Sequence, residues 1–425
     1  MRTLLALATL EDWEIHQVDV KSAFLKGDLD EEIYMQQPEG FQTVGQEKKV
    51  CHLLKALYGL KQASRQWHRK LRSALLDMGF DQLTADTSVY VYRRQGGITI
   101  LMVYVDDITV MGNDAAHIIL VKQELAKRFD LTDLGELTYF LGIRVTRDRK
   151  NRTLELDQSK YIRDVLIRFQ MIDVTPAFTP LAAGSQLLKS SRPVEDNDSS
   201  FITHYQSLVG SLMYAMLGTR PDLSFAVTKL SQFGSNPTDY HFKAAKHVLR
   251  YLSATQNYRL QFGSIDDNEI TGYSDSDWAA DQNDRRSTTG YAFLYAGGSI
   301  SWASRKQTTV ALSSTEAEYM AISDASRHAI WLRTLFSELG FKQTSPLLIH
   351  VDNKGSVDLA LNPVHHKCTK HIDIKHHFIR QCLEDFSVEL VQIPTNENFA
   401  DVLTKNLPFA KHSLFSGKLG VLTKD

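Results

Sequence analysis

The sequence predicts an α/β protein with more than one domain, and three observations support this prediction. First, 425 residues are too many for one ordinary hydrophobic core, so we expect two or three domains. Second, strand-like and helix-like patterns alternate over residues 1–170. Third, a similar mixture begins at about residue 266 and continues to about 410. Between them, residues 172–200 are rich in Pro, Ser and Asp, which is typical of a linker, and residues 204–256 favour helices.

The composition narrows the class of protein. The formal net charge is −2, so any surface for nucleic acid must be local. Three cysteines, Cys51, Cys368 and Cys382, are too few and too scattered for a disulfide framework, and we expect a reducing compartment. No apolar stretch approaches the roughly 20 residues of a membrane span. The apolar start has no small-residue cleavage site, so we do not expect a signal peptide.

The first half begins with a predicted strand and a predicted helix. The segment "WEIHQVDV" (13–20) alternates as a strand does, and residues 60–80 have helical spacing. Four apolar residues share one face of that helix: Ala63, Trp67, Leu71 and Ala74. Four basic residues share the opposite face: Lys61, Arg65, Arg69 and Arg72. Such a basic run is more often a solvated surface than a binding site, although it could also contact phosphates.

Two adjacent carboxylates interrupt the apolar run "LMVYVDDITV" (101–110). The flanking residues predict a strand, a tight turn and a second strand, with Asp106 and Asp107 at the turn. A buried ionised carboxylate is costly unless it is paired or bound to a metal. The pair is therefore either an ordinary turn signal or a cation site. A two-metal phosphoryl transferase needs carboxylates from separate strands, and Asp19, at the end of the strand 13–20, could join the pair.

A second set of acids follows in the other half of the chain. Asp275, Glu318, Asp352 and Asp401 are separated by 43, 34 and 49 residues. All but Glu318 lie at or just after the end of a predicted strand, where an α/β sheet places its site. Glu316 and Glu318 each also fit a helix capping box, and we prefer that role for Glu316. Asp277 remains the nearest alternative to Asp275.

These motifs resemble those of a known family. "YVDD" (104–107), "DVKSAFLKGDLDEEIYMQQPEGF" (19–41) and "LLKALYGLKQASRQWH" (53–68) closely resemble the reverse transcriptase of copia-type long-terminal-repeat retrotransposons. "YSDSDWA", "AEYMA", "VDN" and "NFADVLTK" are similar to the RNase H domain of the same elements. The resemblance covers nearly the whole chain. It implies an antiparallel palm sheet with helices, followed by an RNase H-like mixed sheet.

The resemblance also implies domain boundaries and site residues. We expect a palm with partial fingers over 1–184, a connecting segment over 185–265, an RNase H-like domain over 266–412 and a tail over 413–425. The implied metal ligands and catalytic residues are Asp19, Asp106 and Asp107 in the palm, and Asp275, Glu318, Asp352 and Asp401 in the nuclease. The implied nucleotide and template contacts are Phe24, Gly59, Lys61 and Gln62. Phe24 would screen out a ribose 2′-hydroxyl, although an ordinary core aromatic is its alternative role.

The implied function is an RNA-directed DNA polymerase that also degrades the RNA of RNA–DNA hybrids. Because all candidate ligands are carboxylates, we expect two Mg²⁺ ions in each active site, with Mn²⁺ as a substitute. The implied partners are an RNA template, a DNA primer, their hybrid, deoxynucleoside triphosphates, and the integrase and protease of a Pol polyprotein, with no membrane. The expected location is cytoplasmic, in a virus-like particle, or nuclear.

One departure from the family pattern leaves alternatives open. Family members carry finger strands upstream of "RTLLALA", so we expect a fragment of a longer polyprotein. The alternatives are a truncated or adopted copy that only binds nucleic acid or keeps only RNase H activity, and a structural subunit of a complete polymerase. The histidine-rich residues 362–380 match no defensible zinc spacing. The resemblance, which includes a similar segment beside the nuclease site, implies a basic, substrate-facing segment in which His371 or His377 could assist proton transfer. An ordinary polar surface is the alternative.

Overall fold

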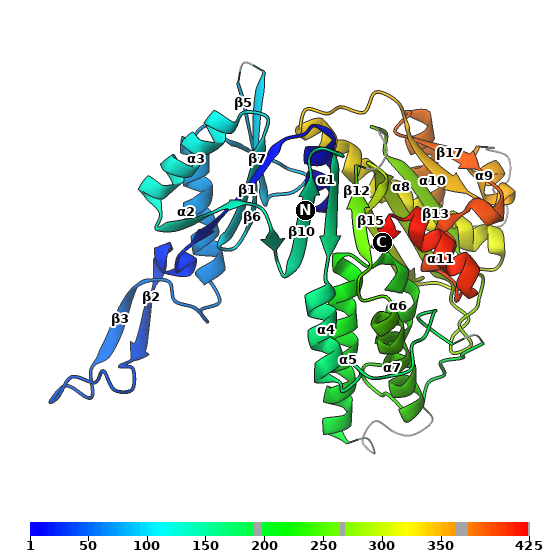
Figure 1. Ribbon diagram of the computed structural model, residues 1–425, viewed down its shortest axis with the longest axis horizontal. Helices are drawn as coiled ribbons and strands as arrows, with labels where there is room; N and C mark the ends of the chain where they lie inside the picture. Colours follow the sequence, from blue (N-terminus) through cyan, green and yellow to red (C-terminus); the bar gives the residue numbers. More distant parts are fainter. Residues whose placement is uncertain (95, 183, 191–197, 264–267, 362–372, 424–425) are drawn as a thin grey trace. The chain divides into compact units, whose positions relative to one another are not determined.

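The computed structural model describes residues 1–94, 96–182, 184–190, 198–263, 268–361 and 373–423 (Figure 1). The chain divides into two compact units. One unit is Glu11–Leu137, and the other combines Met1–Leu10 with Thr138–Asp425. Among the described helices, none has both the length and the apolar character of a membrane span.

The unit Glu11–Leu137 contains a six-stranded sheet with the order β4-β5-β6-β7-β1-β8, and each neighbouring pair is antiparallel. Its strands are β1 (Glu14–Val20), β4 (Asp81–Gln82), β5 (Val89–Arg94), β6 (Gly97–Tyr104), β7 (Asp107–Gly112) and β8 (Leu131–Glu136). A short helix η1 (Ala23–Lys26) and a separate hairpin of β2 (Asp28–Gln36) and β3 (Val50–Lys55) follow β1. The antiparallel sheet expected for the palm is therefore confirmed.

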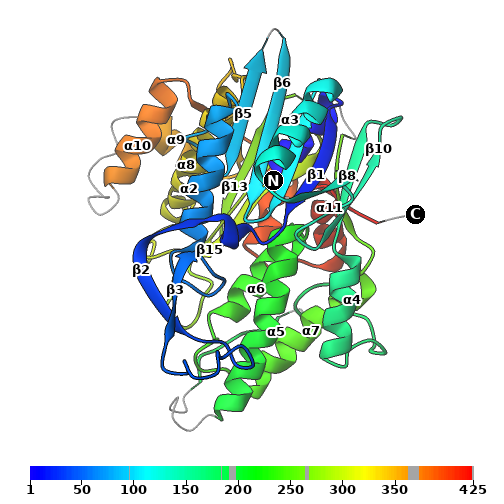
Figure 2. The same ribbon diagram turned by 90° about the vertical axis from the view of Figure 1, so that its left-hand side faces the viewer.

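Two helices, α2 (Ala63–Asp77) and α3 (Ala115–Arg128), pack beside this sheet (Figures 1 and 2). The predicted apolar face of α2 is confirmed, because all four of its residues are buried. Val18 and Val20 of β1 point into the same core. Since side chains alternate along a strand, Asp19 between them points to the face away from this core.

The N-terminal helix α1 (Arg2–Leu10) belongs to the other unit. Arg2 Nε donates a hydrogen bond to the carbonyl of Ile300 at 3.0 Å, and its guanidinium lies 3.9 Å from the ring centre of Trp302. In the same unit, a five-stranded sheet has the order β18-β12-β11-β10-β9. Its strands are β9 (Tyr139–Phe140), β10 (Ile143–Asp148), β11 (Thr153–Asp157), β12 (Arg259–Phe262) and β18 (Val421–Leu422). The divisions between the compact units thus fall after Leu10 and after Leu137, and the expected domain boundaries stay a prediction.

The predicted helical segment consists of α5 (Ser199–Gly218), α6 (Ser224–Ser231) and α7 (Asp239–Ala254), which share one hydrophobic core with α4 (Ser159–Arg168). Parts of the predicted linker are also fixed. Asn406 Nδ2 donates to the carbonyl of Ala182 at 2.8 Å, and Asn283 Nδ2 donates to that of Leu187 at 3.0 Å. The described part of this linker is therefore held against the C-terminal fold.

The C-terminal sheet has the order β15-β14-β13-β16-β17. Its strands are β13 (Thr271–Ser276), β14 (Thr288–Tyr295), β15 (Gly298–Lys306), β16 (Leu347–Val351) and β17 (Val388–Gln392). The first three pair antiparallel, and β16 joins β13 and β17 in parallel, so the expected mixed sheet is confirmed. The described helices of this region are α8 (Ser314–Glu338), α9 (Lys354–Leu361), α10 (Asp373–Glu384), the short η6 (Thr395–Glu397) and η7 (Phe399–Leu403), and α11 (Phe409–Lys418).

Candidate active sites

The first group of acids, here called the N-terminal acidic site, consists of Asp19, Asp106 and Asp107. Asp19 of β1 pairs directly with Asp107 of β7, so their side chains lie on the same face of the sheet. The amide of Val20 donates to the carbonyl of Asp106 at 3.0 Å, and Gln17 Nε2 donates to Asp107 Oδ1 at 3.0 Å. All three carboxylates are half-buried. The expected residues therefore come together at the end of the β6–β7 hairpin.

Burial raises the pKa of Asp19 above its ordinary value, and the neighbouring carboxylates Asp106 and Asp107 raise it further. Like charges that converge in this way make each other harder to ionise, and a bound cation relieves the repulsion. Carboxylate oxygens are also the ligands that Mg²⁺ prefers. The residues of this site thus suit a hard divalent cation.

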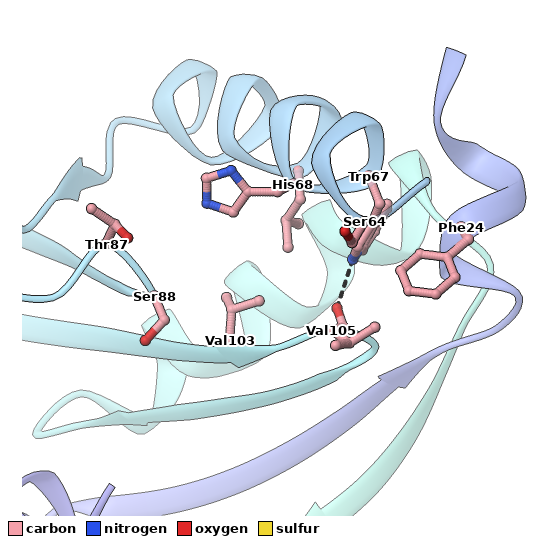
Figure 3. A pocket seen from close by; sticks show the side chains of 9 residues that line it. Phe24, Ser64, Trp67, His68, Thr87, Ser88, Val103 and Val105 are labelled. Atoms are coloured by element: carbon pink, nitrogen blue, oxygen red, sulfur yellow. Dashed lines mark hydrogen bonds between the residues drawn. The ribbon is translucent and has the colours of Figure 1, made fainter. Parts of the chain in front are cut away.

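The turn that carries these aspartates has an unusual backbone. Tyr104 pairs with Asp107, which leaves Val105 and Asp106 as a two-residue turn. Val105 has φ +56°, a left-handed conformation that glycine adopts easily and a β-branched residue rarely adopts. Such a residue costs about 1–3 kcal/mol and persists only where its surroundings hold it. Trp67 of α2 supplies one restraint, since its indole Nε1 donates to the Val105 carbonyl at 2.6 Å (Figure 3).

A cavity of about 190 Å³ lies beside this turn (Figure 3). Its lining includes Phe24, Ser64, Trp67, His68, Val103 and Val105. Phe24 is half-buried, and its ring centre lies 4.8 Å from that of Tyr58, so it forms a cavity wall and is not only a core residue. Ser64 and His68 are lining residues that no motif predicted. Their i, i+4 spacing beside Trp67 on α2 was the available signal.

The other expected nucleotide contacts do not line this cavity. Gly59 has φ +95°, so this position favours glycine for its backbone conformation. Lys61 is exposed, and Gln62 Nε2 donates to Glu31 Oε2 at 2.8 Å. These three residues lie at the start of α2 or just before it, whereas the cavity follows the side of that helix.

Acidic residues of β2 pair with two basic residues of α2, of which Arg69 belongs to the predicted basic face. Lys70 Nζ lies 2.9 Å from Asp28, which also pairs with Lys55. Arg69 pairs with Asp30 at 2.5 Å. These groups are exposed, so each pair contributes little to stability and could exchange for a phosphate at small cost.

The second group of acids, here called the C-terminal acidic site, is centred on Asp275, Glu318 and Asp352. These residues come from β13, from α8 and from the position after β16, and one oxygen of each lies within 4.8 Å of the others. Asp275 is fully buried and Glu318 is 6% exposed. Among the described residues, Glu318 Oε2 has no hydrogen-bond partner, although it is buried. An unpartnered buried oxygen in a cluster of three carboxylates suits a divalent cation with oxygen ligands.

The electrostatics of this cluster support the same assignment. Burial raises the pKa of Asp275 to about 6, with further contributions from Asp401 and Asp352 that Lys405 and Thr404 partly offset. Burial also raises the pKa of Glu318 well above its ordinary value, and Asp275 and Asp352 add to the effect. A cation at the cluster would reverse these shifts by stabilising the ionised forms.

The fourth expected acid, Asp401 of η7, lies beside Asp275 but outside the group of three. Its Oδ1 is 2.7 Å from Lys405 Nζ, and its Oδ2 is 2.5 Å from Lys411 Nζ. Lys405 Nζ also lies 3.2 Å from Asp275 Oδ1, and the Thr404 hydroxyl donates to the other Asp275 oxygen. Burial alone would lower the pKa of Lys405, but Asp275 and Asp401 outweigh burial and raise it. Both oxygens of Asp401 are therefore engaged by ammonium groups.

Two competing acids have structural roles here. Asp277 Oδ1 accepts the amide hydrogen of Thr288 at 2.8 Å, and its carboxyl group is outside the cluster of three. Glu316 Oε2 accepts the amide of Leu312 at 2.9 Å, while Ser313 caps α8 by accepting the amide of Glu316 at 3.1 Å. Ser313 thus caps α8, and the Glu316 side chain bonds to Leu312, the residue before the cap. His377 is exposed on α10, whereas His371 lies outside the described residues.

Comparisons with known proteins agree with the sequence resemblance. A family model described as reverse transcriptase (RNA-dependent DNA polymerase) matches residues 1–183. The Pol polyprotein of transposon TNT 1-94 from Nicotiana tabacum is 44% identical over 424 residues, which are 99% of this chain and 32% of that protein. The chain thus spans about a third of that relative.

Two further matches cover most of the other protein. The putative transposon Ty5-1 protein of Saccharomyces cerevisiae is 33% identical over 72% of this chain and 98% of its own length. A solved RNase H1 from compost, LC11, is 19% identical with a TM-score of 0.26, over 32% of this chain and 93% of that one. On the sequence matches, the chain belongs to the Pol polyprotein family of copia-type long-terminal-repeat retrotransposons.

Proposed function

We propose that this chain is the polymerase and nuclease part of a retrotransposon Pol polyprotein. It would copy RNA and then DNA into DNA, and it would degrade the RNA strand of the resulting hybrid. The observation that carries the proposal is the presence of two separate carboxylate groups, one in each compact unit, in a chain of this family. A family of this kind uses divalent metal ions, and we propose Mg²⁺, two per site, with Mn²⁺ as a substitute.

At the N-terminal acidic site, Asp19, Asp106 and Asp107 would hold the ions. Bound ions would activate the primer 3′-hydroxyl and stabilise the leaving pyrophosphate. Phe24 would stand against the sugar of the incoming nucleotide and leave no room for a 2′-hydroxyl. Gly59, Lys61 and Gln62 would contact the nucleotide and template, and the exposed ammonium of Lys61 is available for a phosphate.

At the C-terminal acidic site, Asp275, Glu318 and Asp352 would hold a metal ion and Asp401 would complete the ligand set. Bound ions would activate a water for attack on the RNA phosphate and stabilise the leaving 3′-oxygen. Asp401 must first release Lys405 or Lys411, because both of its oxygens face ammonium groups. Lys405 would keep Asp275 ionised until an ion arrives.

The proposed partners are an RNA template, a DNA primer, their hybrid and deoxynucleoside triphosphates. The relative TNT 1-94 is a Pol polyprotein of which this chain spans 32%, and we propose that integrase and protease regions accompany the chain in the complete polyprotein. The domain boundaries given above, and a cytoplasmic virus-like particle or the nucleus as the location, belong to the same proposal.

The test is one incubation of the purified 425-residue chain with Mg²⁺, a labelled RNA template, an annealed DNA primer and deoxynucleotides. Primer extension and RNA cleavage are scored on the same gel, with EDTA and an all-DNA duplex as controls. We expect both activities. Cleavage without extension would favour the alternative, a copy that keeps only RNase H activity. The observation that favours this alternative is the close grouping of the three C-terminal carboxylates. Loss of both activities would refute the proposal.

A further inference from the structure

We propose that Trp67 is a positioning residue of the polymerase site, because its indole N–H fixes the turn that presents Asp106 and Asp107. This inference rests on the proposed polymerase function. Trp67 itself touches none of the reacting groups in this proposal. It acts through the backbone carbonyl of Val105, the residue that immediately precedes the two aspartates.

The turn needs a restraint because of its sequence. A two-residue hairpin turn with positive φ at its first position normally has glycine there. Here the residue is Val105, whose branched side chain disfavours the observed φ of +56°. Without a restraint, the backbone would relax to a common conformation, and the relaxation would reorient the next residue, Asp106.

Trp67 is well placed to provide this restraint. Its side chain is only 2% exposed, and its ring meets Phe129 edge-on with 5.2 Å between ring centres. The indole therefore has a fixed orientation, and its N–H lies 2.6 Å from the Val105 carbonyl oxygen (Figure 3). A buried indole donor is normally paired, so breaking this bond would leave both groups without their partner.

Besides the pairing of Tyr104 with Asp107, the turn has two further hydrogen bonds from β1, a strand of the same sheet. Val20 donates to the Asp106 carbonyl, and Gln17 donates to the Asp107 carboxylate. These contacts hold the residues after Val105, whereas Trp67 holds Val105 itself from a helix. Trp67 and Val105 also both line the cavity that contains Phe24.

The test uses Trp67→Phe, which keeps an aromatic ring in the core and removes the N–H. We expect kcat for primer extension to fall about 10- to 100-fold, because a small misplacement of catalytic groups is enough for such a loss. The KM for deoxynucleotide should change little, and RNA cleavage by the same molecule should stay at the wild-type level. Adding Val105→Gly should restore part of the rate, because glycine adopts positive φ without the hydrogen bond.

A second measurement does not depend on activity. In an Asp352→Asn background, which weakens the C-terminal acidic site, Mn²⁺ binding to the N-terminal acidic site is followed by electron paramagnetic resonance. We expect Trp67→Phe to weaken this binding several-fold. The matched control is Phe129→Leu, which loosens the same packing but keeps the N–H. It should lower the melting temperature without a selective loss of kcat.

Each outcome decides the inference. If Trp67→Phe has the kcat and the Mn²⁺ affinity of the wild type, the inference is wrong. It is also wrong if the variant loses both primer extension and RNA cleavage and has a lower melting temperature. If the wild-type chain cleaves RNA but does not extend primers, the polymerase proposal fails, and Mn²⁺ affinity then decides the role of Trp67 alone. Weaker binding in Trp67→Phe would support the role, and unchanged binding would overturn it.

Discussion

The two acidic sites use the same kind of side chain in different surroundings. At the N-terminal acidic site, three half-buried carboxylates lie on a sheet face at the end of a hairpin. The nearby Lys21 lies 3.7 Å from Asp130, so its charge is shared with a carboxylate outside the site. At the C-terminal acidic site, the buried Asp275 and Glu318 and the half-buried Asp352 are grouped within 4.8 Å, and Lys405 contacts Asp275 and Asp401 directly.

The two sites therefore stabilise neighbouring ionised carboxylates in different ways. A half-exposed site can rely on water until metal and substrate arrive. A buried site cannot, because desolvation makes an uncompensated charge costly, and here lysines supply the compensation. The C-terminal acidic site should therefore bind a divalent ion tightly before substrate arrives, whereas the N-terminal acidic site should bind an ion more weakly until the nucleotide adds its phosphate ligands.

The largest expected effect separates the two sites. Asp106→Asn should reduce primer extension at least about 10³-fold and leave RNA cleavage intact, because a two-metal site depends on its ligand charge. Asp352→Asn should do the reverse. Both activities are measured on one RNA–DNA substrate, with circular dichroism to confirm folding. If either folded variant lost both activities, the two sites would not be independent.

The next largest effect concerns the stability of the metal-free protein. Since the pKa of Asp275 is about 6 when folded and about 3.8 when unfolded, the folded state binds more protons between these values. Asp275 therefore lowers the free energy of unfolding as pH rises through this window, by about 2–3 kcal/mol at pH 7. In EDTA, Asp275→Asn should be more stable than wild type at pH 7.5, and the difference should shrink toward pH 4.

Adding Mg²⁺ provides the control for this variant. Wild type should gain stability from bound ion, whereas Asp275→Asn should gain little, because it lacks a ligand. Thermal melts at several pH values, with and without Mg²⁺, measure both effects. If the melting temperatures of wild type and Asp275→Asn in EDTA changed in parallel with pH, the raised pKa of Asp275 would be contradicted.

A third prediction uses the opposite demands that the two sites place on the ribose 2′-hydroxyl. The polymerase site must reject it on the incoming nucleotide, whereas the nuclease must accept it on the strand that it cuts. Phe24→Val should raise ribonucleotide incorporation about 10- to 100-fold, because the smaller side chain removes the cavity wall. RNA cleavage should not change. Tyr58→Phe, which preserves the ring packed against Phe24, is the matched control and should leave discrimination intact.

Much of the local structure could be predicted because it follows from periodicity. The hairpin around Asp106 and Asp107 and the apolar face of α2 appear in the sequence as alternation and helical spacing. The position of α1 could not be predicted in this way. Seven of its nine residues are buried, which indicates a buried helix, but nothing local shows that Arg2 packs on Trp302, 300 positions away.

The candidate sites show the same limit. Motifs identified the acids, but the hydrogen bond from Trp67 to Val105 depends on how α2 packs, which periodicity does not determine. For Lys405 a signal was present, because it follows Asp401 by four residues, a spacing that favours an ion pair on a helix. Lys411 had no such signal, since it reaches Asp401 from the following helix, α11.

The smallest expected effect tests how these two lysines differ. Lys405→Met removes an ammonium that touches both Asp275 and Asp401, whereas Lys411→Met removes one that touches Asp401. Lys405 is partly solvent-exposed, so we expect its loss to cost about 1 kcal/mol of metal-free stability after allowance for solvent screening. The same loss frees carboxylate oxygens near the cluster, so Mg²⁺ affinity should rise about fivefold, measured by calorimetry.

Lys411→Met should change affinity less, because Asp275 keeps its lysine. If both variants bound Mg²⁺ with the affinity of the wild type, the lysines would not compete with the ion. The two acidic sites would then differ only in how deeply their carboxylates are buried.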